Sequence, residues 1–258
     1  MYQSFTAPYT ASGRSALVGP PPWHYAGWLL NVEFECDVAQ GEQLLARRHG
    51  RLTGRGCVHF AEWQTGSSGD DAAPDPVYAQ YRETIVTVEI ERADGTRVNF
   101  CPFIYVDQDI ALLRGLLQGW PKKLGSTTLT RCLPLDHPAA APLRPGTRLR
   151  AGLTVKERRL LEAELQLEAG DAEPLGFLAR PTLGLVGWPD LRTPERLPQP
   201  ELLRSDITGR VDSRWQPASA QLTRLDHPVE ELSLLGPLRA TRASAGWLGL
   251  TVRGALQA

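Results

Sequence analysis

Apolar and polar side chains alternate along much of this chain, which is the pattern of β-strands with one buried face. The alternation is clearest in residues 159–168 (RLLEAELQLE), where Leu161, Ala163 and Leu165 are separated by polar residues. Other β-prone stretches predict strands at residues 28–37, 57–64, 81–91, 97–106, 127–132, 149–155, 218–225 and 247–253. The chain is therefore expected to be rich in strands.

The strongest local signal is that of a hairpin. Residues 81–91 and 97–106 flank Ala93-Asp94-Gly95-Thr96, and an Asp-Gly step between two β-prone runs favours a tight turn. These two strands are therefore predicted to pair antiparallel. The polar, Gly- and Pro-rich residues 65–77 are predicted to form a loop.

One stretch has the periodicity of a helix. Ile110, Leu113 and Leu117 fall on one helical face. Asp107 is expected to cap the first turn, and Gly119-Trp120-Pro121 is expected to end the helix. Less regular segments predict a short helix at 42–48, coil at 178–203 and a helical turn at 229–235.

Strands outnumber helices in this pattern, and the two do not alternate as they do in proteins with parallel sheets. The predicted fold is therefore mainly β (α+β class), as an antiparallel barrel or sandwich with a few short peripheral helices. No linker divides the chain. Residues 1–258 are predicted to form one domain, with residues 1–27 as a partly extended N-terminal segment.

The charge balance narrows the class of partner. The 258 residues include 28 basic and 29 acidic side chains, so neither nucleic acid nor an anionic membrane is expected as a partner. A small molecule is expected instead. No apolar run reaches the roughly 18 residues of a membrane span, and the first 25 residues lack the features of a signal peptide. A cytoplasmic protein is predicted.

Several kinds of site find no support in the sequence. The four cysteines are far apart, and no phosphate loop, dinucleotide fingerprint or serine-hydrolase elbow is present. His59 and Glu62 are three residues apart on a predicted strand, so their side chains point to opposite faces. Neither a metal nor a cofactor is predicted.

The lysines are unusual because the chain otherwise relies on arginine. It contains 25 Arg and only three Lys, of which Lys122 and Lys123 are adjacent. Arginine cannot replace lysine where the amine must lose its proton. The pair is either a solvated basic turn after a helix or an amine nucleophile that forms a Schiff base with a carbonyl substrate. The apolar neighbours Trp120 and Leu124 favour the second interpretation.

Glu83 is a second candidate, with two interpretations. Strand alternation places it on the same face as Tyr81 and Ile85, and this is the more polar face of its strand. In a sheet packed on one side that face meets solvent, whereas inside a ligand-holding barrel it lines a cavity. Glu62 lies on a more apolar face of its own predicted strand.

The order of several segments resembles the acetoacetate decarboxylase family. The segments that carry the resemblance are Tyr-x-Glu at 81–83, YVDQD at 105–109, PKKLG at 121–125, RPTLGLVGWPD at 180–190, Trp215 before a strand and HPVEELSLLGPL at 227–238. The resemblance implies a cone-like β-barrel and a symmetric homo-oligomer that acts on a small keto acid without a cofactor.

The resemblance also implies roles for individual residues. Lys122 would form the Schiff base, Lys123 would be the neighbour that lowers its pKa, and Glu83 would be the glutamate of the pocket. Trp120 stands where an aromatic residue lines that pocket, and Tyr81 and Glu62 are expected to contact the substrate. The leading predicted reaction is decarboxylation of a β-keto acid through an imine.

Two departures from the family pattern leave other functions open. Many members carry Gly-Arg-Glu early in the helix before the lysines, where this chain has Arg114-Gly115-Leu116. The arginine that meets the substrate carboxylate in decarboxylases has no match in WHYAGWLL (23–30); Arg82 or Arg114 are alternatives. A Schiff-base aldolase or dehydratase is the second hypothesis, and a noncatalytic barrel that binds a small ligand is the third.

Overall fold

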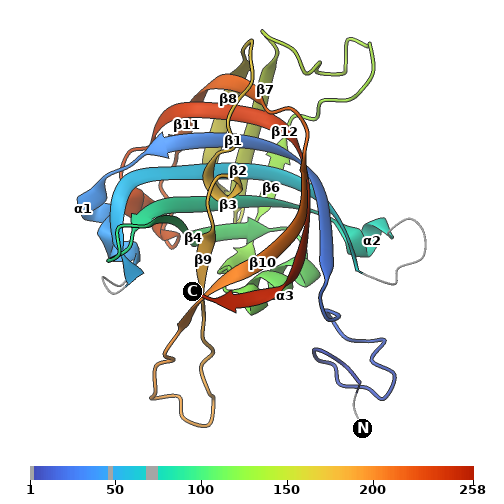
Figure 1. Cartoon of the computed structure of the whole chain (residues 1–258), viewed down its shortest axis with the longest axis vertical. Coiled ribbons are helices and arrows are strands. Elements are labelled where there is room, and N and C mark those ends of the chain that lie inside the picture. The colour runs from blue at the N-terminus through green and yellow to red at the C-terminus, as the bar shows by residue number, and fades with distance from the viewer. Residues whose placement is uncertain (1–2, 46–48, 68–74) are drawn as a thin grey trace.

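A computed structural model describes residues 3–45, 49–67 and 75–258 of the chain. Strands make up most of its regular structure (Figure 1). They are β1 (Trp23–Glu35), β2 (Arg51–Ser67), β3 (Gln80–Glu91), β4 (Arg97–Val106), β5 (Lys122–Leu124), β6 (Ser126–Leu129), β7 (Arg148–Val155), β8 (Arg158–Leu167), β9 (Thr182–Val186), β10 (Glu201–Asp212), β11 (Gln216–Arg224) and β12 (Arg239–Gln257). The helices are α1 (Val38–Gly41), α2 (Pro76–Ala79) and α3 (Asp109–Gln118), with 3₁₀ turns η1 (Glu42–Leu44), η3 (Gly176–Leu178) and η4 (Glu231–Leu235).

Strand pairing forms a ring with an extension. The ring runs from β1 through β2, β3, β4, β9, β10 and β12, and β12 pairs again with β1. From β12 the sheet continues through β11, β8 and β7 to β6. The pairs are antiparallel except that β5 and β9 each run parallel to β4. The predicted mainly β fold with short helices is confirmed, as is the predicted β3–β4 hairpin.

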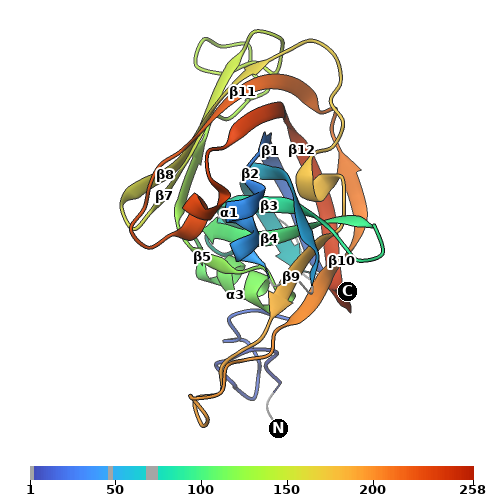
Figure 2. The ribbon, with the colours of Figure 1, turned by 90° about the vertical axis from the view of Figure 1, so that its left-hand side faces the viewer.

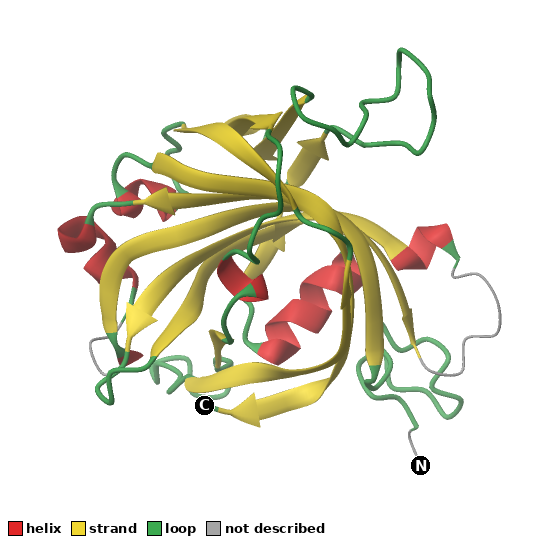
Figure 3. Cartoon of the chain, turned by 45° about the horizontal axis from the view of Figure 1, so that its top comes forward, coloured by secondary structure: helices red, strands yellow, loops and turns green. Residues whose placement is uncertain are grey.

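The strands β1–β4 are covered on both faces. On one face, Phe60 and Val86 pack in a large apolar cluster with side chains of β7, β8 and β11, which lie to one side of β1–β4 in Figure 2. On the other face, Ala61 and Trp63 belong to a second cluster with Ala111 of α3. Figure 3 shows α3 in the hollow of the curved strands. Neighbouring residues of β2 are therefore buried in opposite directions.

Helix α3 matches the predicted helix in its buried face and its end. Ile110, Leu113 and Leu117 pack against an apolar cluster around Trp23. Gly119 ends the helix in the left-handed region at φ 85°, where glycine carries no Cβ penalty. The predicted cap is wrong. The N-cap is Gln108, and the carboxylate of Asp107 instead accepts a hydrogen bond from the backbone N–H of Arg82 at 2.8 Å.

Three other predicted segments differ from the structure. The coil predicted at 178–203 contains β9, which the parallel neighbour β4 and the antiparallel neighbour β10 hold in place. Strand β10 itself was not predicted, because its residues are mostly exposed and register shifts interrupt its pairing with β12. In place of the helix expected at 42–48 the chain has α1 and η1, and residues 46–48 lie outside the described part.

The loop predicted at 65–77 also begins later, because β2 continues to Ser67; residues 68–74 lie outside the described part of the chain. Among the described residues, no helix has the length and apolar character needed to cross a membrane.

Candidate active site

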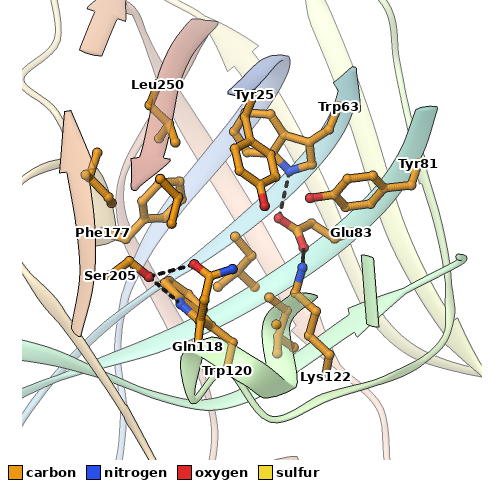
Figure 4. A pocket seen from close by; sticks show the side chains of 15 residues that line it. Tyr25, Trp63, Tyr81, Glu83, Gln118, Trp120, Lys122, Phe177, Ser205 and Leu250 are labelled. Carbon is orange, nitrogen blue, oxygen red and sulfur yellow. Dashed lines mark hydrogen bonds and ion pairs between the residues drawn. The ribbon is translucent and has the colours of Figure 1, made fainter. Parts of the chain in front are cut away.

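A small cavity of about 70 Å³ lies between α3 and the strands that line the hollow. At about 10–15 Å³ per water-sized group, it has room for a small organic molecule. Figure 4 shows side chains from distant parts of the sequence converging on it. The residues that line it are Tyr25, Trp63, Tyr81, Glu83, Ile85, Ile104, Gly115, Gln118, Trp120, Lys122, Phe177, Ser205, Ile207, Leu250 and Val252.

Lys122 reaches the cavity from β5, the short strand that follows α3. Its side chain is only 8% exposed, and its Nζ lies 2.9 Å from Oε2 of Glu83. The amine also lies 5.2 Å from the ring centre of Tyr81. The stem of Lys122 passes directly over Gly115 of α3, where an added Cβ would come within 2.3 Å of the lysine Cδ. The absence of a side chain at Gly115 therefore permits this path.

Glu83 is the acidic partner of this amine. Its residue is 4% exposed, and its Oε1 accepts a hydrogen bond from the indole N–H of Trp63 at 2.7 Å. The hypothesis that this face of β3 meets solvent is wrong, because α3 and η3 cover it. Each carboxylate oxygen of Glu83 thus has a different partner, one indole and one amine.

Two tyrosines place phenol groups beside Glu83 (Figure 4). Burial raises the pKa of Tyr25 to about 12, and the charge of Glu83 acts in the same direction, while Arg114 and Gln118 oppose it. Burial, reinforced by Glu83, also holds the pKa of Tyr81 well above its usual value. Both phenols therefore keep their protons at neutral pH and can donate hydrogen bonds to a bound oxygen.

Of the two arginines considered for a substrate carboxylate, Arg114 is the one beside the cavity. It is 9% exposed, its Nη1 donates to Oγ1 of Thr65 at 3.1 Å, and its side chain hydrogen-bonds Tyr25. Its Nε is buried without a hydrogen-bond partner in the described part of the chain. Arg82 instead lies 3.6 Å from Glu62 on a half-exposed surface.

A hydrogen-bonded chain lines one side of the cavity. The indole N–H of Trp120 donates to Oγ of Ser205 at 3.2 Å, and this hydroxyl donates to Oε1 of Gln118 at 2.9 Å. The amide of Gln118 in turn donates to the carbonyl of Arg114 at 3.0 Å. The edge of Trp120 also contacts the ring of Phe177, with 6.4 Å between the ring centres.

The structure brings together four of the predicted site residues: Lys122, Glu83, Tyr81 and Trp120. Lys123 and Glu62 lie elsewhere. Adjacent residues of a strand point to opposite faces, so Lys123 turns away from the cavity and binds both carboxylate oxygens of Glu230, at 2.9 and 2.8 Å.

Glu62 likewise points away from its neighbour Trp63 and pairs with Arg131 and Arg82 outside the cavity. The structure therefore places neither Glu62 nor Lys123 in the lining of the cavity, and the predicted substrate contact of Glu62 and the predicted effect of Lys123 on the pKa of the amine stay predictions. The reason is the same in both cases: the side chain lies on the face of its strand that is turned away from the cavity.

Several lining residues were not predicted from the sequence. Tyr25, Trp63, Phe177 and Ser205 come from separate strands and a 3₁₀ turn, so no local pattern joins them. The sequence did contain a signal for Gln118. It is the last residue of the predicted helix, directly before Gly119, and so lies close to the lysine pair. No cluster of His, Cys, Asp and Glu suited to a metal ion occurs among the residues that the structure describes.

Comparison with known proteins identifies the family. The family model "Acetoacetate decarboxylase (ADC)" matches residues 6–256. The solved structure of the enduracididine biosynthesis enzyme MppR, complexed with the condensation product of pyruvate and imidazole 4-carboxaldehyde, is 26% identical. It has a TM-score of 0.91, and the match covers 100% of this chain and 97% of that chain.

An acetoacetate decarboxylase-like enzyme from Sphingomonas wittichii RW1 is 25% identical with a TM-score of 0.88, over 99% of both chains. Acetoacetate decarboxylase from Legionella pneumophila shares the fold, at 15% identity and a TM-score of 0.72, over 93% of this chain and 88% of that one. Among curated proteins, no sequence matches. With a family match over nearly its whole length, the chain belongs to the acetoacetate decarboxylase family.

Proposed function

We propose that this protein is a Schiff-base lyase in which Lys122 forms an imine with a small keto acid. The observation that carries the proposal is the ion pair between Lys122 and Glu83, buried in a small and mostly apolar cavity. A lysine that serves only as a surface cation has no reason to be placed there. The predicted cone-like barrel, homo-oligomer and cytoplasmic location belong to the same proposal.

The pair supplies the proton transfers that imine formation needs. Glu83 takes a proton from the Lys122 ammonium, and the free amine attacks the ketone carbon. The attack leaves a positively charged nitrogen and an alkoxide oxygen; Glu83 gives its proton to this oxygen and takes one from the nitrogen, which completes the neutral carbinolamine. Glu83 then donates that proton to the hydroxyl group, which leaves as water while the nitrogen lone pair forms the C=N bond. The product is an iminium, which withdraws electrons from the neighbouring carbon.

The side of the cavity formed by Tyr25 offers donors for the acid group of the substrate. Arg114 carries a buried positive charge and an unused N–H, and Tyr25 presents a phenol next to it. A carboxylate that binds here is held by a charge-assisted hydrogen bond. We therefore propose that Arg114, with Tyr25, binds the substrate carboxylate. The sequence left this role open between Arg82 and Arg114.

Two reactions can follow from the same iminium. In a β-keto acid, the C–C bond to the carboxylate breaks, carbon dioxide leaves and its electron pair forms an enamine. In a 2-keto acid, loss of a proton from the adjacent carbon forms the enamine, which attacks an aldehyde and makes a new C–C bond. The likeness to MppR, whose solved complexes contain pyruvate and a pyruvate condensation product, favours the second reaction.

Reductive trapping tests the proposal. Borohydride is added with pyruvate and, separately, with acetoacetate, and peptide mass mapping locates the reduced adduct. We expect an adduct on Lys122 at neutral pH and its complete loss in Lys122→Arg, since a guanidinium does not give up its proton. Lys156→Arg, at an exposed turn, is the matched control and keeps the adduct.

The same experiment separates the alternatives. An adduct and carbon dioxide release with acetoacetate support the decarboxylase, whereas an adduct with pyruvate and condensation with an aldehyde support the aldolase. If neither keto acid gives an adduct while a known family enzyme is labelled in parallel, the imine mechanism is wrong. The noncatalytic ligand-binding protein would then be the better hypothesis.

A further inference from the structure

A second and larger cavity lies directly outside the candidate active site. It has a volume of about 410 Å³ and shares Trp120, Phe177, Ser205 and Ile207 with the inner cavity. We call this outer cavity the vestibule. Two of the shared residues, Trp120 and Ser205, are hydrogen-bonded to each other, and Ser205 also bonds Gln118 of the inner cavity. The boundary between the two cavities therefore lies at Trp120 and Ser205.

The vestibule has an excess of positive side chains. Arg180, Arg204 and Arg210 line it, against a single carboxylate, that of Asp206, among its described lining residues. The carboxylate of Asp206 lies 3.1 Å from Arg253 and is therefore already neutralised.

The three arginines differ in their partners. Arg180 lies 2.9 Å from Glu89, and Arg210 lies 2.6 Å from Asp212. Arg204 extends from β10, is exposed and forms no ion pair with a carboxylate of the described chain. It is thus the vestibule cation whose charge is available to a ligand.

The position of the reactive pair determines which way a bound molecule extends. In Figure 4, Phe177 and Ser205 lie on the other side of the cavity from Tyr81 and Glu83. A molecule joined to Lys122 fills the inner cavity with its reacting carbons, and a longer chain can extend towards Phe177 and Ser205, which line both cavities. That path ends in the vestibule.

From this geometry we infer that the vestibule binds a distal carboxylate of the molecule that reacts with Lys122, through Arg204. The substrate class is then a keto acid with a second acidic group at its far end. This inference rests on the proposed imine chemistry, which supplies the fixed end of the molecule. It adds a binding site and a specificity determinant that the imine chemistry itself does not require.

The test compares two keto acids of equal length, 2-oxohexanoate and 2-oxohexanedioate, with pyruvate as a short reference. The measured quantity is the keto acid concentration that gives half-maximal borohydride adduct on Lys122. We expect wild-type protein to favour the dicarboxylate, and Arg204→Gln to lower this preference by roughly three- to tenfold, as for a partly solvated charge pair. Pyruvate trapping is expected to stay unchanged.

Two further variants make the result specific. Arg204→Lys keeps the charge and is expected to keep most of the preference. Arg196→Gln removes an exposed arginine from the loop between β9 and β10 and is expected to change nothing. The preference is also expected to fall as salt is added, since salt screens a partly exposed charge.

The possible failures are distinguishable. Equal half-maximal concentrations for the two six-carbon acids in wild-type protein would overturn the vestibule inference while pyruvate trapping upholds the imine. A preference that Arg204→Gln leaves intact would overturn the assignment to Arg204. Absence of any pyruvate adduct would overturn the proposed function, and the inference with it.

Discussion

Glu83 has two different neighbours for its two oxygens, which fixes both its orientation and its chemistry. The indole of Trp63 holds Oε1 at 2.7 Å, and this leaves Oε2 directed at the amine of Lys122, 2.9 Å away. A carboxylate fixed in this way exchanges a proton with the amine without first having to turn. We therefore expect its position to affect the rate of the proposed imine formation.

Replacing Glu83 by glutamine tests this role. The amide oxygen can still accept the Trp63 hydrogen bond, so the fold is expected to persist, but the side chain can no longer take a proton. We expect borohydride trapping of pyruvate to slow by about 10²–10⁴-fold, the usual effect of a lost general acid–base group. Glu62→Gln, outside the cavity, is the matched control. If Glu83→Gln were trapped at the wild-type rate, Glu83 would not be the group that transfers the protons.

Lys123 has a structural partner in place of a catalytic one. Glu230 is buried, and burial alone would raise the pKa of its carboxyl. Hydrogen bonds from Lys123 and from Tyr105, the latter at 2.7 Å, outweigh burial and leave this pKa below its usual value. A carboxyl with a lowered pKa stabilises the fold above about pH 4.5, and this contribution disappears as the pH falls.

We therefore expect Lys123→Met to act on stability. It should lower the free energy of unfolding at pH 7 by about 1 kcal/mol, a small value because the amine is half exposed. The difference from wild type should shrink below about pH 4.5. Urea unfolding at several pH values measures both effects, and pyruvate trapping on Lys122 should stay within about twofold of wild type. A large loss of trapping at unchanged stability would restore the catalytic role that the sequence implied.

At the residue level, the sequence identified the reactive centre better than its surroundings. The lysine pair stood out because lysine is rare in this chain, and the family resemblance singled out Lys122 and Trp120. Tyr81 followed from its place on the same strand face as Glu83. The sequence left the direction of Glu83 undecided because both faces of β3 are buried. For the adjacent Lys123, strand alternation was the decisive fact, but the three-residue strand β5 is too short to be recognised from its sequence.

The elements α3 and β5 act together to place the lysine. Helix α3 ends at Gly119, Trp120 and Pro121 turn the chain, and β5 then runs parallel to β4 beside the helix. Gly115 lies where the lysine stem crosses the helix. The helix therefore has a residue of low helix propensity in its interior, and packing against Lys122 explains its presence.

Gly115→Ala is expected to separate stability from activity. Alanine favours a helix over glycine by about 1 kcal/mol, but its Cβ would lie within 2.3–2.5 Å of Lys122 carbons, so the flexible stem must move. We expect stability within about 1 kcal/mol of wild type and trapping reduced by roughly 10²-fold. Gly254→Ala, where an added Cβ meets nothing within 4 Å, is the control. Unchanged trapping would show that Lys122 does not need this path.

Elements with a clear local pattern were predicted correctly, and β9 and β10, which lack one, were not. The β3–β4 hairpin and the apolar face of α3 each follow from a short stretch of sequence. Strand β9 has only five residues and is held by partners more than a dozen residues away. In strand β10, register shifts interrupt the pairing and most side chains are exposed. The sequence of β10 therefore lacks the alternation of apolar and polar residues from which a strand is predicted.

At the scale of the whole molecule, a buried polar chain links three neighbouring strands that lie far apart in the sequence. In β2, Nδ1 of His59 lies 2.7 Å from Oδ1 of Asn31 in β1, whose amide donates to Oγ of Ser244 in β12 at 3.2 Å. The ring of His59 also contacts Phe177, with 4.5 Å between the ring centres. Burial lowers the pKa of His59 to about 3, so the ring stays neutral in the folded protein.

This histidine makes stability depend on pH. Between about pH 6.5 and pH 3 the unfolded chain binds a proton at this position that the folded protein does not, so stability falls as the pH falls. His59→Gln should remove up to about 1.4 kcal/mol per pH unit from that slope. Urea unfolding of both proteins between pH 6 and pH 4 measures the difference, and replacement of the exposed His137 by glutamine is the control. Equal slopes for wild type and His59→Gln would contradict a neutral buried ring.

The Lys122–Glu83 pair and the vestibule arginines lie on different elements, and this division has an evolutionary consequence. The reactive amine and carboxylate belong to β5 and β3, whereas the vestibule arginines come from β10 and the segment just after η3. Mutations can therefore accumulate in the outer segments and change which molecules are accepted, while the bond-making groups stay intact. A directed-evolution library confined to residues 179–182, 204 and 208–210, none of which lines the inner cavity, should retain imine formation in most of its members and vary in substrate range.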